Sequence, residues 1–274
     1  MFYDNHNHSE FSFDGGHTSV ERAASEAASK GLGGLCFTDH CDFTVPEIKA
    51  ELEPVVCEVF DVEAQQAEID RVKEKMKGRI RLFKGIEVGL NIESRDKIRG
   101  HLASHSFDEV IASVHYLDGH DPWMGPEYYY KGKTFKEAYG HYLECMYEEM
   151  TWLGDFDIMG HYDYIARYAS YPEASVMYRD FPDIFDAMFK YLAENGKALE
   201  INTKSYGLDR GTILDPDVLT RFRELGGEAV SLGSDSHEPE RVGTDFERFA
   251  AVVRDAGFRY LAHFEQRRLV MEKI

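Results

Sequence analysis

The sequence has few cysteines and no long hydrophobic run. No apolar stretch approaches the roughly 18 residues that a membrane-spanning helix needs. The opening residues, MFYDNHNHSEF, contain neither a basic segment nor an apolar one, so no secretory signal is expected and a cytoplasmic location is predicted. The cysteines are irregularly spaced and form no C-x-x-C pair, so reduced thiols are expected rather than a disulfide framework: Cys36, Cys41, Cys57 and Cys145.

Positive charge is also scarce. Lys and Arg number 31 against 50 Asp and Glu, which gives a formal net charge of −19 at pH 7. Binding to nucleic acid or to an anionic membrane surface is therefore not expected, because either would need a basic face. An acidic protein can still bind an anionic substrate if a local cluster of cations holds it. The oligomeric state cannot be inferred from these features.

Helix and strand patterns alternate along all 274 residues, and no linker or change of composition divides them, so residues 1–274 are predicted to form one domain. Alternation favours parallel strands with crossover helices. A closed barrel is favoured over an open sheet because chemically reactive residues follow nearly every strand. Helices are expected over 18–31, 61–77, 96–103, 134–153, 183–194, 215–226 and 244–256, and strands at the start and over 33–38, 79–87, 109–115, 156–161, 198–202, 228–235 and 258–263.

Local signals mark where several helices begin. The segments that start at Thr18, Thr134 and Thr244 each have glutamate three residues later, which is the pattern of a capping box. Asp215 precedes a proline and is expected to cap the helix that follows it. The segments 42–60, 117–133 and 162–181 are irregular and are expected to be loops, the first with a short helical piece.

The first sixteen residues contain a compact group of possible metal ligands. His6 and His8 are two positions apart, and alternate side chains of an extended segment share a face, so both imidazoles are expected to point the same way. Two neutral imidazoles on one side suit a transition metal ion. Asp14 precedes a Gly-Gly pair that allows a sharp turn, and its carboxylate could return over the two rings. An isolated His-x-His segment is weak evidence, since surface histidines also occur at this spacing.

Residues of metal-ligating type recur at the ends of the later strands. In a parallel barrel all of these ends meet at one rim. So many ligands exceed what one tetrahedral ion uses, and they suit two or three ions that share a carboxylate. Glu87 is the natural shared ligand because its two oxygens can reach separate ions. The predicted metal ligands are His6, His8, Asp14, His40, Glu87, His115, His161, Asp235 and His237.

These motifs, in this order, resemble the polymerase and histidinol phosphatase (PHP) superfamily, and within it the histidinol-phosphate phosphatases. The resemblance spans nearly the full chain. It is carried by His6-Asn-His8-Ser-Glu-Phe-Ser-Phe-Asp14-Gly, Thr38-Asp-His40, Gly85-Ile-Glu87, Ser113-Val-His115, Gly160-His161-Tyr-Asp163, Glu200-Ile-Asn202-Thr and Ser234-Asp235-Ser-His237.

The resemblance implies an α/β fold, a single distorted (β/α)7 TIM-like barrel, with a trinuclear metal site. One of the eight expected strands should then lie outside the barrel, and the last strand is the candidate. Many relatives have histidine where Asp14 stands, so the third ion could be weakened or changed. The ions would be Zn, Fe or Mn, since all three accept histidine and carboxylate ligands. The implied ligand sets are His6, His8, Glu87 and Asp235 for one ion, Glu87, His115 and His161 for a second, and Asp14, His40 and His237 for a third.

The resemblance further implies a metal-dependent phosphomonoesterase of histidine biosynthesis that hydrolyses L-histidinol phosphate to L-histidinol and phosphate. A water held between two ions would attack phosphorus as hydroxide. Glu87 would hold the ions, and Asp235, His237 or a metal-bound water would protonate the leaving group. The candidates for binding the substrate phosphate are Arg167, Arg210 and Lys204.

Other residues near the motifs have two interpretations. Asp39 and Asp163 could orient ligand imidazoles or could simply cap helices. The aromatic segment, with Trp123 and residues 128–130, is expected to be an ordered loop over the site that either contacts the substrate or closes the rim. As alternatives in function, the chain could hydrolyse another small phosphate or a nucleotide, or could be a non-catalytic metal-binding scaffold. A nuclease is disfavoured because no basic groove is evident.

Overall fold

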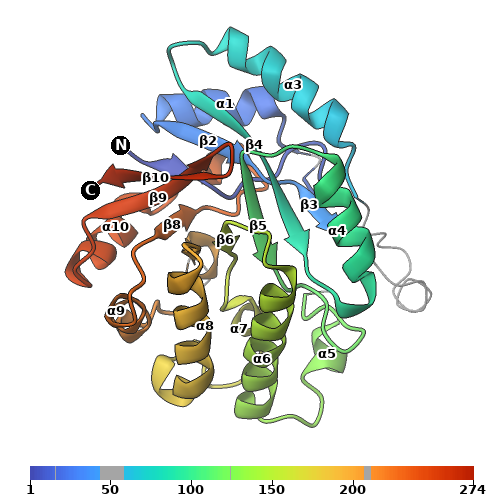
Figure 1. Ribbon diagram of the computed structural model, residues 1–274, viewed down its shortest axis with the longest axis vertical. Helices are drawn as coiled ribbons and strands as arrows, with labels where there is room; N and C mark the ends of the chain where they lie inside the picture. Colours follow the sequence, from blue (N-terminus) through green and yellow to red (C-terminus); the bar gives the residue numbers. More distant parts are fainter. Residues whose placement is uncertain (16, 44–58, 124, 207–210) are drawn as a thin grey trace.

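The strands of the main sheet lie parallel around a nearly closed barrel (Figure 1). The computed structural model describes residues 1–15, 17–43, 59–123, 125–206 and 211–274. The expected (β/α)7 fold is confirmed, because the strand order around the barrel has seven positions. In order these are β1 (Tyr3–Asp4), β2 (Gly34–Phe37), β4 (Arg81–Gly89), β5 (Glu109–Ser113), β6 (Ile158–Met159), β7 (Ala198–Asn202) and β8 (Val230–Gly233).

An additional short strand, β3 (His40–Asp42), continues the position of β2. β2 pairs with the first half of β4, with Gly34 opposite Arg81, whereas β3 pairs with the second half, with His40 opposite Glu87. The strand expected at 33–38 is therefore followed, after its hydrophobic residues end, by β3. β3 reaches residue 42, where the expected loop 42–60 begins. Residues 44–58 of that segment lie outside the described ranges.

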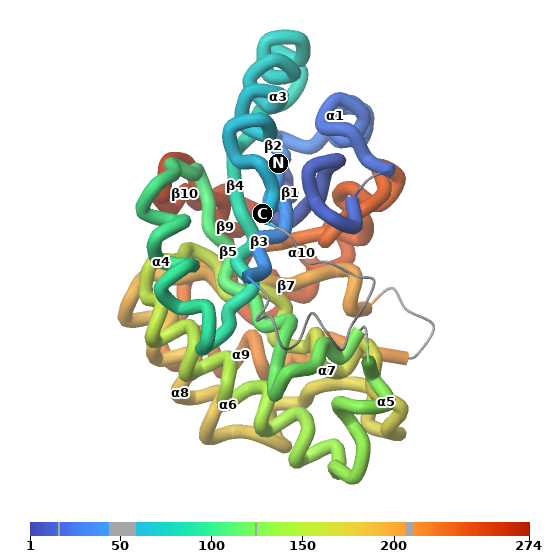
Figure 2. Tube along the Cα trace, turned by 90° about the vertical axis from the view of Figure 1, so that its right-hand side faces the viewer, coloured from blue at the N-terminus to red at the C-terminus, as the bar shows by residue number. Residues whose placement is uncertain are grey.

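The barrel is closed by hydrogen bonds that link the residues after β1 to the end of β8 and the residues after it. The backbone N–H of Asn5 donates to Leu232 O at 3.1 Å, and that of Asp235 donates to His6 O at 2.8 Å. His8 N donates in turn to Ser236 O at 2.9 Å. The blue start of the chain and the orange segment near its end therefore lie side by side (Figure 2). Because these bonds run from residue 5 to residue 8, they fix the two imidazoles of that segment at the rim.

Helices surround the barrel and bury its outward-facing side chains (Figure 1). Val110 and Ala112 of β5 face this helical layer, whereas Ile111 between them faces the barrel interior with Ile158 and Ala198. The helices are α1 (Val20–Ser29), α3 (Val62–Lys75), α4 (Arg95–Ser104), α5 (Pro126–Tyr129), α6 (Phe135–Leu153), α7 (Tyr164–Arg167), α8 (Pro182–Glu194), α9 (Pro216–Glu224) and α10 (Phe246–Asp255), with 3-10 turns η1 (Ile92–Ser94), η2 (Tyr178–Asp180), η3 (Thr203–Tyr206) and η4 (Pro239–Arg241).

The predicted helix starts are confirmed at two positions and wrong at two others. Thr134 and Glu137 form a full capping box, and Asp215 accepts a hydrogen bond from Asp217 N. At the first helix the cap is Ser19, because the hydroxyl of Thr18 is used by His237 O. The last helix begins after Asp245, whose left-handed backbone, with φ of 63°, replaces the expected box. The expected loops at 117–133 and 162–181 also contain short helices, α5 and α7, and the turn η2.

The chain ends in an antiparallel hairpin outside the barrel, β9 (Tyr260–Glu265) and β10 (Arg268–Lys273). The expectation that the strand at 258–263 lies outside the barrel is confirmed, and β10 was not expected. Ala262 and Phe264 pack on the interior cluster that contains Ile111, so the hairpin covers the amino ends of the strands. Within the described ranges, no helix is both long enough and apolar enough to span a bilayer.

Candidate metal centre

Side chains of metal-ligating type converge at the carboxyl ends of the barrel strands. Ligand atoms lie within 4.8 Å of one another in five overlapping groups, and all nine predicted ligands belong to at least one of them. The tenth member is Asp42. The groups are His8, Asp14, His40 and His237; His6, His8 and Glu87; His6, His161 and Asp235; His40, Asp42 and His115; and Glu87, His115 and His161.

Glu87 lies at the middle of this constellation and is fully buried. Its Oε1 atom is 3.3 Å from Nε2 of His6, and the same oxygen is 2.9 Å from Nε2 of His161 and 3.2 Å from Nε2 of His115. Oε2 lies 3.6 Å from Nε2 of His8 and 2.9 Å from Nδ1 of His40. The two oxygens therefore face different sets of imidazoles, as a bridging carboxylate must.

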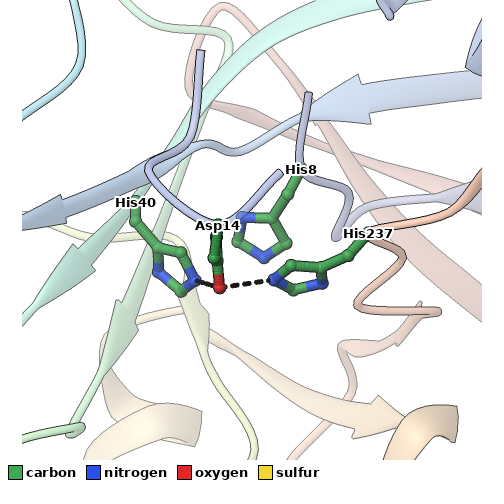
Figure 3. Close-up of side chains that lie close together, drawn as sticks. All are labelled: His8, Asp14, His40 and His237. Atoms are coloured by element: carbon green, nitrogen blue, oxygen red, sulfur yellow. Dashed lines mark hydrogen bonds and ion pairs between the residues drawn. The ribbon is translucent and has the colours of Figure 1, made fainter. Parts of the chain in front are cut away.

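A second part of the constellation surrounds Asp14 (Figure 3). Its Oδ2 atom is 3.0 Å from Nε2 of His237 and 3.5 Å from Nε2 of His40. The ring of His8 lies next to the rings of both histidines, with its centroid 4.2 Å from the centroid of His40 and 4.2 Å from that of His237. The structure thus brings together the three members of the third predicted ligand set, with His8 beside them.

Two buried carboxylates in the constellation were not predicted. Asp42 Oδ1 lies 3.0 Å from Nδ1 of His115, and Glu200 Oε1 lies 2.7 Å from Nδ1 of His6. The spacing of His40 and Asp42 repeats that of His6 and His8, so alternation along an extended segment was a usable signal. Glu200 belongs to one of the motifs that carry the resemblance, but it lies inside β7 rather than at its end, and no ligand or supporting role was assigned to it.

Glycines make room for both carboxylates. A Cβ atom at Gly89 would lie 1.7 Å from Oδ1 of Asp42, and one at Gly233 would lie 2.2 Å from Oε1 of Glu200. Neither position tolerates a larger residue without moving the carboxylate beside it. The two glycines are therefore part of how the strands position the site.

The buried ligand atoms fit divalent cations. His6 Nε2, His8 Nε2, His40 Nδ1 and Glu87 Oε2 are buried and face one another or Glu87 Oε1, but none of them makes a well-oriented hydrogen bond. Unpaired polar atoms are costly inside a protein unless a ligand or ion satisfies them. Imidazole nitrogens mixed with carboxylate oxygens are the donor set that zinc, iron and manganese accept.

The electrostatics of the imidazoles depend on which carboxylates they face. Burial opposes the charged form of His6, but the carboxylates of Glu87 and Glu200 outweigh it and raise the pKa of His6 well above its usual range. Burial likewise opposes charge at His40, yet Glu87 and Asp14 raise its pKa to about 10. Burial and the neighbouring imidazoles of His40 and His237 instead lower the pKa of His8. Without ions, the centre therefore holds a mixture of charged and neutral rings.

The cationic side chains of the site pair with Asp235. Arg167 Nη1 lies 2.7 Å from Oδ2 of Asp235, and Lys204 Nζ lies 3.2 Å from its Oδ1. Burial favours the neutral acid, but Lys204 and Arg167 hold the pKa of Asp235 well below its usual range. Arg167 and Lys204, both predicted to bind phosphate, thus line the same pocket as the candidate ligands. Arg210, the third candidate, lies outside the described residues.

Two predicted supporting roles differ from what the structure contains. The carboxylate of Asp39 accepts hydrogen bonds from the backbone and hydroxyl of Ser9 and from Gln65, and so fixes the loop after His8 rather than an imidazole. Asp163 accepts a hydrogen bond from the hydroxyl of Ser205. Asp39 therefore supports the backbone segment after His8, and Asp163 supports the hydroxyl that accepts a hydrogen bond from Arg167.

The aromatic segment contributes one side chain to the pocket. Trp123 lines a cavity of about 240 Å³ that also contains Tyr164, Arg167 and the candidate ligands, and it is 44 % exposed. Tyr129 and Tyr130 are buried in the core, and Tyr128 points to solvent. The expected loop over the site is therefore mainly a packed wall, with Trp123 at the opening.

Comparison with known proteins agrees with this geometry. The family model of the PHP domain matches residues 4–204. The histidinol-phosphatase of Lactococcus lactis subsp. lactis (strain IL1403) is 32 % identical over 261 residues, which is 95 % of this chain and 93 % of the relative. The histidinol-phosphatase of Bacillus subtilis (strain 168) is 25 % identical over 269 residues, 90 % of this chain and 97 % of that protein.

A solved structure is similar over almost the whole chain. It is the crystal structure of the L. lactis histidinol phosphate phosphatase in complex with zinc, L-histidinol and phosphate. It has a TM-score of 0.88 and 30 % sequence identity, and the match covers 98 % of both chains.

Proposed function

The chain belongs to the PHP domain family, and from this premise we propose that it is a histidinol-phosphatase. Such an enzyme is a metal-dependent hydrolase that converts L-histidinol phosphate to L-histidinol and phosphate. The observation that carries the proposal is the convergence of five imidazoles on the buried carboxylate of Glu87. The similarity to the L. lactis enzyme, which binds zinc, L-histidinol and phosphate, supports the choice of substrate.

The centre would hold two or three divalent ions, with zinc favoured over iron or manganese because zinc is bound in the L. lactis enzyme. Glu87 would be shared between two ions. The proposed sets are those that the family resemblance implies: His6, His8, Glu87 and Asp235 for one ion, Glu87, His115 and His161 for a second, and Asp14, His40 and His237 for a third. Three of the five groups of neighbouring ligand atoms and the contact of His8 with Asp235 support them.

When bound, the ions supply an activated water and positive charge against the phosphoryl oxygens. The protein's own contribution is to place further cations beside them. Arg167 is buried and directed into the pocket by Asp235 and by the hydroxyl of Ser205, 2.9 Å from its Nε atom. A guanidinium held in this way is preorganised for two phosphate oxygens. Lys204 provides a second, more mobile charge on the same side.

The leaving alkoxide also needs a proton. Asp235 is a poor donor at neutral pH, since Lys204 and Arg167 hold its pKa low and keep it ionised. The remaining side-chain candidate is His237, whose Nδ1 atom lies 3.1 Å from Nζ of Lys204 and whose Nε2 atom lies 3.0 Å from Asp14, and it could donate the proton only when it does not bind the third ion. Asp235 would act as a ligand and as the partner that positions Arg167.

The net negative charge of the chain does not oppose this role. Surface charges are screened beyond about 8–10 Å, whereas the ions, Arg167 and Lys204 act on the phosphate at contact distance. An acidic protein surface also disfavours nucleic acids, which separates this small-molecule role from a nuclease role.

The test is a panel of phosphate esters assayed with protein reconstituted with zinc, iron or manganese. A preference in kcat/KM for L-histidinol phosphate over nucleotides and sugar phosphates is expected. Hydrolysis without that preference would leave a PHP phosphoesterase of another specificity. The absence of any hydrolysis above the background would favour a metal-binding scaffold instead.

A further inference from the structure

One carboxylate in the pocket has no role in the metal centre. Four aspartates line the cavity among the described residues. Asp14, Asp42 and Asp235 each contact a candidate ligand imidazole. Asp121 contacts none of them, although it is just 3 % exposed and lines the same space. Its presence there needs another explanation.

Asp121 is held in place by two donors on the same oxygen. Its Oδ1 atom accepts a hydrogen bond from the backbone N of Trp123 at 2.7 Å and another from the hydroxyl of Tyr164 at 2.8 Å. The ring of Tyr164 packs against His115 and His161, with centroids 5.3 and 5.1 Å apart. The carboxylate is therefore fixed one tyrosine away from the candidate metal ligands.

The other oxygen of Asp121 has no hydrogen bond to any residue in the described ranges, where Asp121 also forms no ion pair with lysine or arginine. Burial raises the pKa of Asp121, even though Trp123, Tyr164 and the nearby charge of His115 act in the opposite direction. A buried carboxylate of this kind is short of positive charge. A cationic ligand in the pocket would supply it.

We propose that Asp121 is a specificity residue that binds a cationic nitrogen of the substrate through its second carboxylate oxygen. The inference rests on the proposed function, because it assigns the part of the substrate that is not phosphate. The pocket would then hold the phosphate at the ions, Arg167 and Lys204, and the cationic nitrogen at Asp121. The substrate class is a phosphate monoester that also carries an ammonium or imidazolium group, and Trp123 offers it an aromatic face.

The test compares the wild type with Asp121→Asn on matched ester pairs. The amide keeps the size of the side chain and an oxygen for Tyr164 and Trp123, but removes the charge. O-phosphoethanolamine is paired with ethyl phosphate to isolate the ammonium group, and 3-(imidazol-4-yl)propyl phosphate is paired with propyl phosphate to isolate the imidazole. L-histidinol phosphate and 4-nitrophenyl phosphate complete the panel.

We expect Asp121→Asn to lower kcat/KM for the cationic esters by about 10- to 100-fold, mainly through KM, as for the loss of a charged hydrogen bond. The neutral esters should change less than about threefold, because they carry no cation for Asp121 to bind. In each pair the ratio of kcat/KM for the cationic ester to that for the neutral ester is compared between wild type and variant. The pair in which this ratio falls identifies the nitrogen that Asp121 binds. Equal losses on cationic and neutral esters would overturn the proposal.

Two further variants keep the test interpretable. Asp118→Asn removes a nearby exposed carboxylate that pairs with His141 and lies outside the pocket, so the ratios should not change. Tyr164→Phe keeps the ring against the imidazoles but removes one donor to Asp121. It should therefore lower kcat/KM for the cationic esters, but by less than Asp121→Asn does. Tyr164→Phe also replaces Asp121→Asn if the latter fails to fold.

A binding measurement separates this inference from the proposed function. L-histidinol carries both nitrogens and no phosphate, so its affinity for the metal-loaded protein can be measured by calorimetry even if no ester is hydrolysed. Weaker binding to Asp121→Asn than to the wild type supports the inference whatever the preferred ester proves to be. Equal binding together with unchanged ester ratios would refute it, even if L-histidinol phosphate is the preferred substrate.

Discussion

Oε1 of Glu200 lies 2.7 Å from Nδ1 of His6, inside the barrel and beneath the rim. His6 and the neighbouring His161 both lower the pKa of Glu200 despite its burial, so the carboxylate is ionised and Nδ1–H of His6 donates to it. This bond directs Nε2 of His6 at Glu87, so Nε2 is the atom that can face an ion once it has lost its proton. Oε2 of Glu200 accepts a hydrogen bond from the backbone N of His161 at 2.6 Å, so one carboxylate orients two candidate ligands.

Glu200→Gln should lower metal affinity by about 10- to 100-fold, because the amide removes the charge and offers a donor where His161 N–H needs an acceptor. The measurement is metal content after dialysis against a graded series of chelator concentrations. Glu228→Gln, an exposed position before β8, is the control and should retain metal as the wild type does. Equal retention by both variants would contradict the orienting role.

Replacement of the central carboxylate should have a larger effect. Five imidazoles face Glu87, and its loss removes the ligand that the proposed ions share. We expect Glu87→Ala to lower kcat/KM by about three orders of magnitude, equivalent to several kcal/mol of transition-state stabilisation. Glu144→Ala, on the exposed side of α6, provides the matched control. Near-normal turnover by Glu87→Ala would place the chemistry elsewhere.

Metal binding should release protons. In the metal-free protein the pKa of His40 is about 10, and the pKa values of His6 and His115 are raised well above the usual range, so all three rings are protonated at pH 7.5. An imidazole must be neutral to bind a metal ion, so these rings lose their extra protons as the ions bind. Calorimetric titration with zinc in buffers of different ionisation enthalpy should show the release of up to about three protons. An identical heat in all buffers would show that the rings are already neutral.

Gly89→Ala should disturb the site through Asp42. The added Cβ would lie 1.7 Å from Oδ1 of Asp42, the oxygen that is 3.0 Å from Nδ1 of His115. We expect tenfold or greater loss of metal affinity, as for other residues that orient ligands, which is about 1.4 kcal/mol. Gly100→Ala in α4 is the control: a Cβ there meets nothing within 4 Å, and its stability should rise by about 0.5–1 kcal/mol. If Gly89→Ala retained full metal affinity, Asp42 would have no orienting role.

The hairpin turn at the other end of the barrel offers a stability test. Gln266 and Arg267 have positive φ values of 51° and 62° without being glycine. Arg267 compensates by pairing with the buried carboxylate of Asp157 and, at 2.9 Å, with Asp155. Arg267→Ala should lower the free energy of unfolding by about 1–3 kcal/mol, because it leaves Asp157 without its cation. Thermal unfolding measures the loss, and kcat/KM should stay unchanged since the rim is distant from the turn.

Much of the site could be predicted because ligands at strand ends follow a simple rule: the carboxyl ends of parallel strands meet at one rim. His115 and His161 were found in this way. Asp42 was missed because its segment has few hydrophobic residues, and pairing with β4 rather than local preference makes it a strand. Glu200 was missed because its partner His6 is 194 residues away. The prediction that Thr18 caps the first helix was wrong for a similar reason, because the hydroxyl of Thr18 donates its hydrogen bond to the distant carbonyl of His237.

The closure of the barrel by residues 5–8 has a consequence for synthesis on the ribosome. The first imidazoles emerge at once, but the backbone groups that fix them belong to Leu232 and Ser236 and are translated more than two hundred residues later. Contacts so far apart in sequence form late and slowly. A nascent chain therefore cannot capture its ions in the final arrangement until almost all of the described barrel has left the exit tunnel, and metallation becomes one of the last steps of maturation.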